Sequence, residues 1–321
     1  MNDGRSGTAT GTTFETPPAE APSLDSCFFY HSVDLPLSGA IEGQWDLRGQ
    51  AGTYLGGVDL RDRRVLELGP ASGFLTVSME QAGARVTARE LANYEQWDIV
   101  PYRSLDADRL REYVEDRQEL GSRLRNSFWR TLHEFDSSAR LTLGTVYDLP
   151  HDLGAFDVTV FGSILLHVRD PLQAVLTAAA RTREAIVVTD ILPGHGLPPA
   201  ALEHVQPKRG AAPSAEQVAE LNRVVSEPIA NQSPALHFVP DPIARSPLDT
   251  WWQLTPAVVR RFLELAGCRQ IDTTLHYQQY DPRFRWLDPA PESDPVHFAM
   301  FTTVGRFDDQ PGGSTVDRRS P

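Results

Sequence analysis

The segment VLELGPASGFLTVSMEQAGARVTARE, Val65 to Glu90, constrains the fold of this chain more than any other part of the sequence. A buried-strand pattern from Val65 to Leu68 runs into a turn of small residues, and a helical pattern follows from Phe74 to Ala82 until Gly83 ends it. Small residues let the backbone approach a ligand closely, and the start of the helix offers unpaired amides. The next strand leads to Glu90, where a carboxylate can bind both hydroxyls of a ribose. We therefore predict nucleotide-type binding at the carboxyl end of a sheet.

Short apolar runs and longer helical patterns alternate through most of the remaining chain. The expected strands are Arg85 to Ala88, Arg140 to Leu143, Phe156 to Phe161 and Ala185 to Thr189, and the expected helices are Ser104 to Phe135, Pro171 to Thr182 and Thr255 to Ala266. This alternation predicts βαβ units and a parallel sheet covered on both faces. Two final strands without a helix between them, near Gln270 to Tyr277 and His297 to Val304, predict an antiparallel hairpin. The fold class is thus α/β: a Rossmann-like, doubly wound, mostly parallel seven-stranded sheet with an antiparallel C-terminal hairpin and an insertion or lid.

Composition divides the chain into a body and two tails. Residues 1–23 are rich in Thr, Gly, Pro and Ala, and residues 307–321 are similar, so we expect a disordered leader and a disordered tail. The body, residues 24–306, has a length compatible with one domain. Within it, residues 193–249 hold many prolines and no convincing strand, which predicts an insertion or lid.

Charge and cysteine content narrow the possible partners. There are 43 acidic and 30 basic residues, a formal net charge of −13, which argues against binding nucleic acid through its phosphates. Cys27 and Cys268 are too few for a disulfide framework or a cysteine-rich zinc site. No apolar run approaches the length of a membrane span, and no signal pattern begins the chain. We expect a soluble cytoplasmic protein with neither nucleic acid nor membrane as partner.

The turn after the first strand resembles a known family motif. Glu67, Gly69, Ala71 and Gly73 are similar to the acidic-x-Gly-x-Gly-x-Gly turn of the class I S-adenosylmethionine (SAM)-dependent methyltransferases, with Ala71 in the place of the middle glycine. In that family the turn lies beside the methionine part of SAM, and the acid after the second strand, here Glu90, binds the ribose. A dinucleotide-binding domain is the alternative, but it usually keeps the spacing Gly-x-Gly-x-x-Gly, which this turn lacks.

Two later segments extend the resemblance, which covers Val65 to Arg306 apart from the insertion. GTVYDLP is similar to the family's segment along the adenine edge, with Thr145 and Val146 in the contacting places, and FDVTVFGSILLHVRDP resembles its fourth-strand motif. The resemblance implies SAM as cofactor and S-adenosylhomocysteine (SAH) as product. The implied cofactor contacts are Tyr30, Glu67, Gly69, Ala71, Gly73, Glu90, Leu91, Trp97, Thr145, Val146, Tyr147, Gly162 and Ser163.

Within the family, the segments FFYHSVDLP, EGQWDLR and YEQWDIVPY resemble a bacterial subgroup of small methyltransferase-domain proteins. They are similar, more remotely, to enzymes that modify the wobble uridine of transfer RNA. The family resemblance also implies that residues 24–60 form an N-terminal segment covering the cofactor pocket.

Two histidines are candidate catalytic residues. Methyl transfer from a sulfonium is an in-line displacement, and histidine is the default base where the nucleophile must lose a proton near neutral pH. His167 follows the fourth strand at the carboxyl edge, and His31 lies in an aromatic segment ahead of the first strand. Packing or a backbone hydrogen bond is the alternative for each. No pair of His and carboxylate residues at i, i+4 spacing suggests a metal site, so we expect a reaction without a metal.

The predicted substrate-binding residues are aromatic. We expect Trp97 to cover adenine and Trp129, His237, Trp251 and Trp252 to contact the substrate, with core packing as the alternative for the tryptophans. The stretch RLREYVEDRQELGSRLR mixes acids evenly with arginines and is typical of a solvated helical face.

The predicted function is transfer of a methyl group from SAM to an O, N or C nucleophile of a small molecule. A chain rich in Pro and Arg, with Lys208 as its one lysine, suggests a high-GC bacterial gene, for which secondary metabolism is a plausible setting. The alternatives are an RNA-modifying methyltransferase, with transfer RNA as substrate, and a catalytically idle methyltransferase fold that serves as an interaction protein. The oligomeric state stays open, with a homodimer as one alternative.

Overall fold

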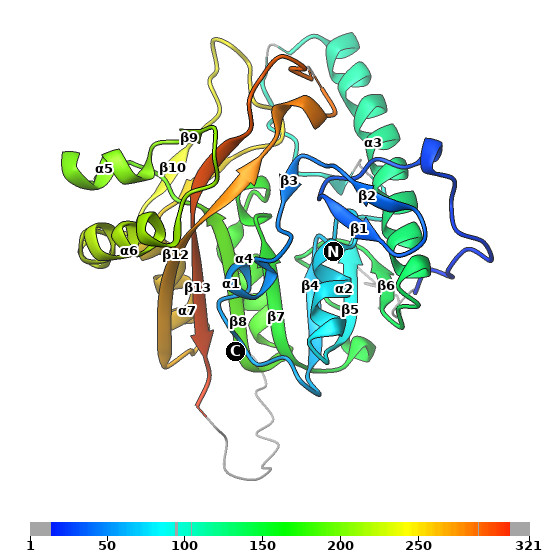
Figure 1. Cartoon of the computed structure of the whole chain (residues 1–321), viewed down its shortest axis with the longest axis horizontal. Helices are drawn as coiled ribbons and strands as arrows, with labels where there is room; N and C mark the ends of the chain where they lie inside the picture. The colour runs from blue at the N-terminus through cyan, green and yellow to red at the C-terminus, as the bar shows by residue number, and fades with distance from the viewer. Residues whose placement is uncertain (1–13, 94–95, 104, 288, 309–321) are drawn as a thin grey trace, which may run out of the picture.

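The computed structural model describes residues 14–93, 96–103, 105–287 and 289–308. Within these ranges a central sheet of nine strands runs through the molecule (Figure 1). Across the sheet the strands are β6 (Arg140–Leu143), β5 (Arg85–Glu90), β4 (Arg64–Leu68), β7 (Phe156–Gly162), β8 (Thr182–Ile191), β13 (Val296–Arg306), β12 (Gln270–Tyr280) and β3 (Trp45–Asp46), with β9 (Lys208–Arg209) paired to β13.

The strand directions confirm the predicted fold class. The five strands from β6 to β8 are parallel, whereas β13 runs antiparallel to β8 and to β12. Seven of the strands form the expected doubly wound sheet with its C-terminal hairpin. The two additional strands, β3 and β9, contain two residues each, which is too short for an alternating pattern to show in the sequence.

Helices cover both faces of the sheet, and alternate residues of each strand point to opposite faces. On one face α2 (Phe74–Gln81) and α3 (Ala107–Glu134) pack with the short α1 (Ala51–Tyr54). On the other face lie α4 (Pro171–Ala179), α5 (Pro199–Val205), α6 (Ala215–Ala230) and α7 (Pro256–Leu265). Neighbouring residues of β7 show the alternation, because Val160 belongs to the first core and Phe161 to the second.

Side-chain caps fix where several helices begin. The Asp106 carboxylate accepts from the first amides of α3, and the Thr255 hydroxyl accepts from the Val258 amide at the start of α7. The second contact confirms the predicted beginning of that helix at Thr255. None of the helices in the described ranges combines the length and the apolar character that crossing a membrane requires.

The predicted N-terminal leader is too long. Residues 1–13 lie outside the described residues, but Phe14 forms a β-bridge with Thr142, and the Glu15 amide donates to the Leu141 carbonyl at 2.8 Å. Because β6 is an edge strand, its unpaired backbone groups offer hydrogen bonds even to a segment with few apolar residues. At the other end Phe307 still pairs with the Glu184 carbonyl, and residues 309–321 of the predicted tail lie outside the described residues.

The proline-rich segment 193–249 is more regular than predicted. Besides α5 and α6 it contains β9 and β10 (Leu236–Phe238), and β10 pairs with β11 (Trp252–Leu254), so the prediction that it lacks strands is wrong. In Figure 1 these elements lie together beside β12 and β13. A capping box between Ser214 and Gln217 starts α6. Most of the segment therefore extends the packed body, and its movement as a lid stays a prediction.

The N-terminal cover segment crosses in front of α3. It contains η1 (Leu24–Ser26), the hairpin of β1 (Val33–Leu35) and β2 (Gly39–Ile41), and then β3 and α1. One buried carboxylate fastens the hairpin: Glu134 at the end of α3 accepts from the Leu37 and Ser38 amides and from the Ser38 hydroxyl. Arg130 completes this cluster with an ion pair to Glu134 at 2.8 Å.

Replacing Glu134 by alanine is expected to lower the free energy of unfolding by about 3 kcal/mol, because it leaves buried donors and the Arg130 charge without their acceptor. Urea denaturation measures the change, and Glu112→Ala, an exposed position on the same helix, is the matched control. A loss of less than 1 kcal/mol in the free energy of unfolding of Glu134→Ala would contradict the role of Glu134 in holding the hairpin, which we call the Glu134 clamp.

The same carboxylate predicts a pH dependence. Burial alone would raise the pKa of Glu134, but the hydrogen bonds from Ser38, Leu37 and Arg130 outweigh it and lower the pKa. The clamp is therefore fully present above the pKa of an unfolded glutamate and is lost as the pH falls through the lower folded value.

Candidate active site

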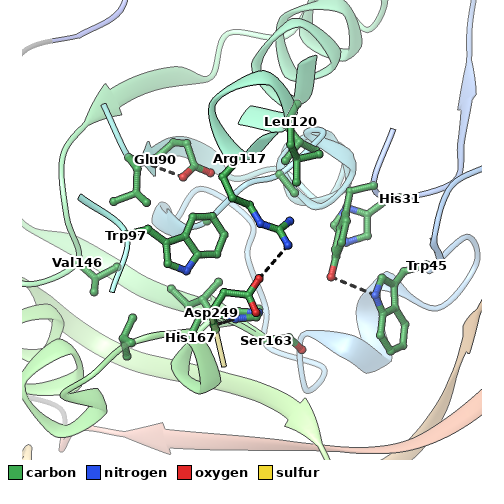
Figure 2. A pocket seen from close by; sticks show the side chains of 18 of the residues that line it. His31, Trp45, Glu90, Trp97, Arg117, Leu120, Val146, Ser163, His167 and Asp249 are labelled. Atoms are coloured by element: carbon green, nitrogen blue, oxygen red, sulfur yellow. Dashed lines mark hydrogen bonds and ion pairs between the residues drawn. The ribbon is translucent and has the colours of Figure 1, made fainter. Parts of the chain in front are cut away.

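A cavity of about 380 Å³ opens at the carboxyl ends of β4, β5, β6 and β7. The parallel strands diverge in connection order between β4 and β7, and such a switch point is where open α/β sheets bind ligands. The cavity brings together most of the predicted site residues from five separate segments (Figure 2). Those that line it are Tyr30, His31, Gly69, Ala71, Glu90, Leu91, Trp97, Thr145, Val146, Tyr147, Gly162, Ser163 and His167.

The turn after β4 needs small residues because of its backbone angles and its close neighbours. Gly69, Ala71 and Gly73 all have positive φ, at 75°, 48° and 84°. A Cβ on Gly69 would lie 2.6 Å from Cγ2 of Ile164, so a side chain there is excluded unless Ile164 moves. Gly73 does not line the cavity; a Cβ at this position would lie 3.3 Å from Phe128 on α3. Gly73 thus supports the packing of α3 against the turn rather than touching a ligand.

Glu67 lies beneath the turn and is not among the residues that line the cavity. Its Oε2 accepts from the Thr76 hydroxyl at 2.5 Å, and its buried Oε1 has no hydrogen-bond partner among the described residues. Burial raises its pKa to about 7. The position of Glu67 outside the cavity lining does not support the predicted direct contact with the cofactor. Its carboxylate instead joins β4 to α2 through the Thr76 hydroxyl.

Glu90, the last residue of β5, lies at the wall of the cavity. Its Oε1 accepts from the Leu91 amide at 2.8 Å, and no hydrogen bond to Oε2 occurs within the described ranges. Arg125 of α3 donates to the Leu91 carbonyl at 2.8 Å, which fixes this loop. Burial raises the pKa of Glu90, while the nearby charge of Arg125 opposes that shift. Glu90 is thus placed to accept hydrogen bonds from a ligand with hydroxyl groups.

Arg89, which the sequence did not point to, shapes the opposite wall. Its guanidinium donates to the carbonyls of Thr145 and Asp148, at 2.9 and 2.5 Å, and holds the loop after β6 against β5. Gly144 makes room for it, because a Cβ there would lie 2.2 Å from Arg89 Nη2. The buried arginine next to Glu90 was visible in the sequence, but its partners are backbone atoms that no residue pattern reveals.

The loop that carries Trp97 is tied to two neighbouring loops. The Tyr147 hydroxyl donates to the carboxylate of Asp98, and the same carboxylate accepts from the Arg169 amide at 2.8 Å. Trp97 contacts the His167 ring edge-on, with the ring centroids 5.9 Å apart. Trp97 therefore lines the cavity between the loop after β6 and the end of β7, and its contact with adenine stays a prediction.

The two candidate bases have different surroundings. His167 Nδ1 lies 2.5 Å from the Asp249 carbonyl, so Nδ1 carries the proton in the neutral ring and Nε2 keeps its lone pair. His31 is buried, its Nδ1 has no hydrogen-bond partner among the described residues, and burial lowers its pKa to about 4. A base with so low a pKa takes up a proton poorly at neutral pH, which favours His167.

An ion pair crosses the cavity at a position that the sequence did not indicate. Arg117 of α3 meets Asp249, the last residue of the insertion, with Nη2 and Oδ2 3.2 Å apart. Figure 2 shows the two side chains meeting between Trp97 and His31. The prediction that this stretch of α3 forms a solvated face is therefore wrong at Arg117. Other lining residues that sequence reasoning missed are Phe28, Trp45, Tyr54, Leu120, Arg285 and Trp286.

Four predicted substrate contacts do not line the cavity. Trp129 is a buried core residue of α3, and the side chains of Trp251 and Trp252 pack together at the start of β11. Their indole groups bury large apolar areas, and the ring N–H of each finds an acceptor there. His237 stacks on His195 with ring centroids 4.3 Å apart, in a separate cleft of the insertion. Core and insertion packing, rather than substrate binding, accounts for these positions.

Asp190, near the end of β8, is a buried carboxyl group that should make the stability of the fold depend on pH. It is 4% exposed, its Oδ1 accepts from the Ile191 amide, and its Oδ2 has no partner among the described residues. Burial raises its pKa to about 7, above that of an unfolded aspartate. The folded state then binds more protons, so its stability falls as the pH rises from about 4 to 7.

As the pH rises from 4 to 7, we expect the free energy of unfolding of Asp190→Asn to increase by a few kcal/mol relative to that of the wild type. Above pH 8 the difference between the two free energies should stay constant. Urea denaturation at pH 4.5, 6 and 8 measures the difference. Asp272→Asn, at an exposed carboxylate of β12, is the control. A difference that does not change with pH would contradict a buried ionising group at Asp190.

Comparisons with known proteins found matches among solved structures alone. No family model matches the sequence, and no curated protein matches it. Solved structures with a similar fold include the N-terminal domain of EvdMO1 with SAH and D-fucose, which is 19% identical, with 80% of this chain and 79% of that chain covered and a TM-score of 0.36. Magnesium protoporphyrin IX methyltransferase (ChlM) of Synechocystis with SAH is 11% identical, with 81% of each chain covered and a TM-score of 0.42.

A third structure is 1,6-didemethyltoxoflavin N1-methyltransferase of Burkholderia thailandensis with its substrate and SAH, which is 14% identical, with 81% of this chain and 78% of that chain covered and a TM-score of 0.39. The fold of this chain rests on its own observed features. Its strand order and its reversed C-terminal hairpin are those of a Rossmann-like, doubly wound sheet, and the turn after β4 has positive φ angles.

Proposed function

We propose that this protein is a SAM-dependent methyltransferase that methylates an O, N or C nucleophile of a small molecule. The observation that carries the proposal is the order of residues along one cavity wall. The turn of Gly69 and Ala71, the carboxylate of Glu90 and the loop of Thr145 and Val146 follow one another across the ends of β4, β5 and β6. That order suits the methionine, ribose and adenine parts of one extended ligand.

The residues present fit such a cofactor. Glu90 has a free carboxylate oxygen for the ribose hydroxyls, and the Gly69 turn lets the backbone approach the ligand. Trp97 and Val146 offer apolar surface on either side of the adenine position. When bound, SAM supplies a methyl group on a positively charged sulfur, ready for displacement.

The chain's own residues would orient the acceptor and take up its proton. His167 Nε2 is the nitrogen left for that purpose, because Nδ1 is engaged by the Asp249 carbonyl. With a hydroxyl acceptor, Nε2 of His167 would take up the acceptor's proton as the methyl group is transferred. The surrounding aromatic walls exclude water and hold the two reactants in line.

A small acceptor is favoured over RNA by charge and shape. The net charge of −13 opposes a polyanionic substrate, and the cavity is enclosed by α3, the cover segment and residues 285–287. A place in secondary metabolism and a cytoplasmic location stay predictions.

The proposal is tested by following SAH formation from SAM with a panel of small hydroxy and amino compounds, and separately with bulk transfer RNA. We expect turnover with at least one small acceptor and none with RNA. Methylated RNA would favour the RNA-modifying alternative. Tight SAM binding without transfer to any acceptor would favour an idle interaction protein.

A further inference from the structure

Arg117 is a mostly buried cation whose hydrogen-bonding capacity is not filled. Its side chain is 16% exposed, pairs with Asp249 through Nη2 and lies over the Tyr113 ring, 4.9 Å from the ring centroid. Its Nε is buried and has no hydrogen-bond partner among the described residues. A guanidinium has five N–H donors, and leaving buried ones unpaired costs free energy. Because Arg117 also lines the cavity, a ligand bound there can supply the missing acceptor.

The position of Arg117 along α3 separates it from the cofactor wall. Arg125 of the same helix reaches the Leu91 carbonyl, directly beside Glu90. Arg117 lies about 12 Å nearer the start of the helix, at 1.5 Å per residue. Its neighbour Asp116 accepts from the Trp286 indole at 2.9 Å, so this part of α3 forms the roof of the cavity.

The roof around Arg117 is aromatic. Phe28 of the cover segment and Trp286 pack edge to face with ring centroids 5.3 Å apart, and both line the cavity. Tyr30 and Trp45 continue the aromatic surface, joined by a hydrogen bond of 3.1 Å. Such walls bind a flat ring well, because ring faces and edges attract one another in offset or edge-to-face arrangements.

We propose that the acceptor is an aromatic carboxylic acid whose carboxylate binds Arg117 at the roof while its ring lies against Phe28 and Trp286. This inference rests on the proposed function and names the substrate class of the same site. A carboxylate matches the fork formed by Nε and one terminal nitrogen of a guanidinium. Asp249 balances the buried charge of Arg117 while no acceptor is bound.

The experiment uses calorimetry on the full chain saturated with SAH, titrated with 4-hydroxybenzoate and with its uncharged analogue 4-hydroxybenzamide. We expect the wild type to bind the acid at least tenfold more tightly than the amide. Arg117→Met keeps the length and apolar stem but removes the fork, so the preference should fall to within twofold. Arg117→Lys, which keeps the charge without the fork, should be intermediate and serves if the Met variant does not fold. Arg111→Met, on the exposed side of α3, should keep the wild-type preference.

Equal binding of acid and amide by the wild type, or a preference that survives in Arg117→Met, would overturn the inference alone. Arg117 could instead bind the carboxylate of the cofactor itself, and comparing SAH with 5′-methylthioadenosine tests this alternative. If Arg117→Met weakens SAH but not 5′-methylthioadenosine, which lacks that carboxylate, Arg117 serves the cofactor and the inference is wrong. Absence of SAH binding by the wild type would instead overturn the proposed function, and the inference with it.

Discussion

Replacing Glu90 by alanine is expected to weaken binding of SAM and SAH about 100-fold. Two ribose hydroxyls donating to one partly buried carboxylate are hydrogen bonds to a charged group, each contributing about 1.5–3 kcal/mol. Glu90 is placed for both, since its Oε2 has no hydrogen-bond partner within the described ranges. Calorimetric titration of the variant with SAH measures the loss directly. Glu90→Gln should recover part of the affinity, because an amide oxygen still accepts one hydrogen bond.

The control for Glu90 is Glu220→Ala, which removes an exposed carboxylate paired with Arg223 on α6, far from the cavity. It should bind SAH as the wild type does. A Glu90→Ala variant that binds SAH with wild-type affinity would contradict the assignment of this wall to the ribose.

Replacing His167 by alanine is expected to lower kcat for a hydroxyl acceptor by at least about 100-fold, the usual contribution of a positioned general base. The Asp249 carbonyl fixes the proton on Nδ1 and leaves Nε2 as the accepting nitrogen. His167→Asn keeps a donor for that carbonyl but has no base, so it should be as slow as the alanine variant. Single-turnover SAH formation with the best acceptor measures the rate.

Two further histidines make the test of His167 selective. His31→Ala should cost less, because a ring whose pKa is about 4 is a weak base at neutral pH. His133→Ala changes an exposed histidine near the end of α3 and should leave the rate unchanged. Wild-type rates in His167→Ala would contradict a role as base and leave positioning alone to drive the transfer.

The sheet could be predicted from sequence because each central strand is a local apolar run next to a turn or helix signal. Residues Val65 to Leu68 are all buried, as the buried-strand pattern indicated. The prediction for the insertion was poorer, because its many prolines argued against regular structure and α6 was not predicted. That helix nonetheless carries a capping box, and it buries Leu221, Val225 and Ile229 at helical spacing. A search for those two signals would have found it.

The cofactor wall was predictable for the same local reason, whereas the roof was not. Gly69, Glu90 and Val146 each lie at the end of a strand or within three residues of it, so strand positions fix where they lie. The roof is assembled by contacts between distant segments: Asp116 and Trp286 are 170 residues apart in the chain. No spacing in the sequence encodes such a contact. Trp129, Trp251 and Trp252 were predicted to bind substrate from their residue type alone, but they pack against other side chains of the fold.

Titration of the wild-type protein with SAH and with SAM by calorimetry tests the central claim most directly. We predict one site per chain and dissociation constants at or below about 100 μM, within the usual range of substrate affinities. Binding should be competitive between the two ligands, because both would occupy the same wall from Gly69 to Val146. No detectable binding of either ligand at about 1 mM by a folded wild-type protein would contradict the assignment of this cavity to SAM.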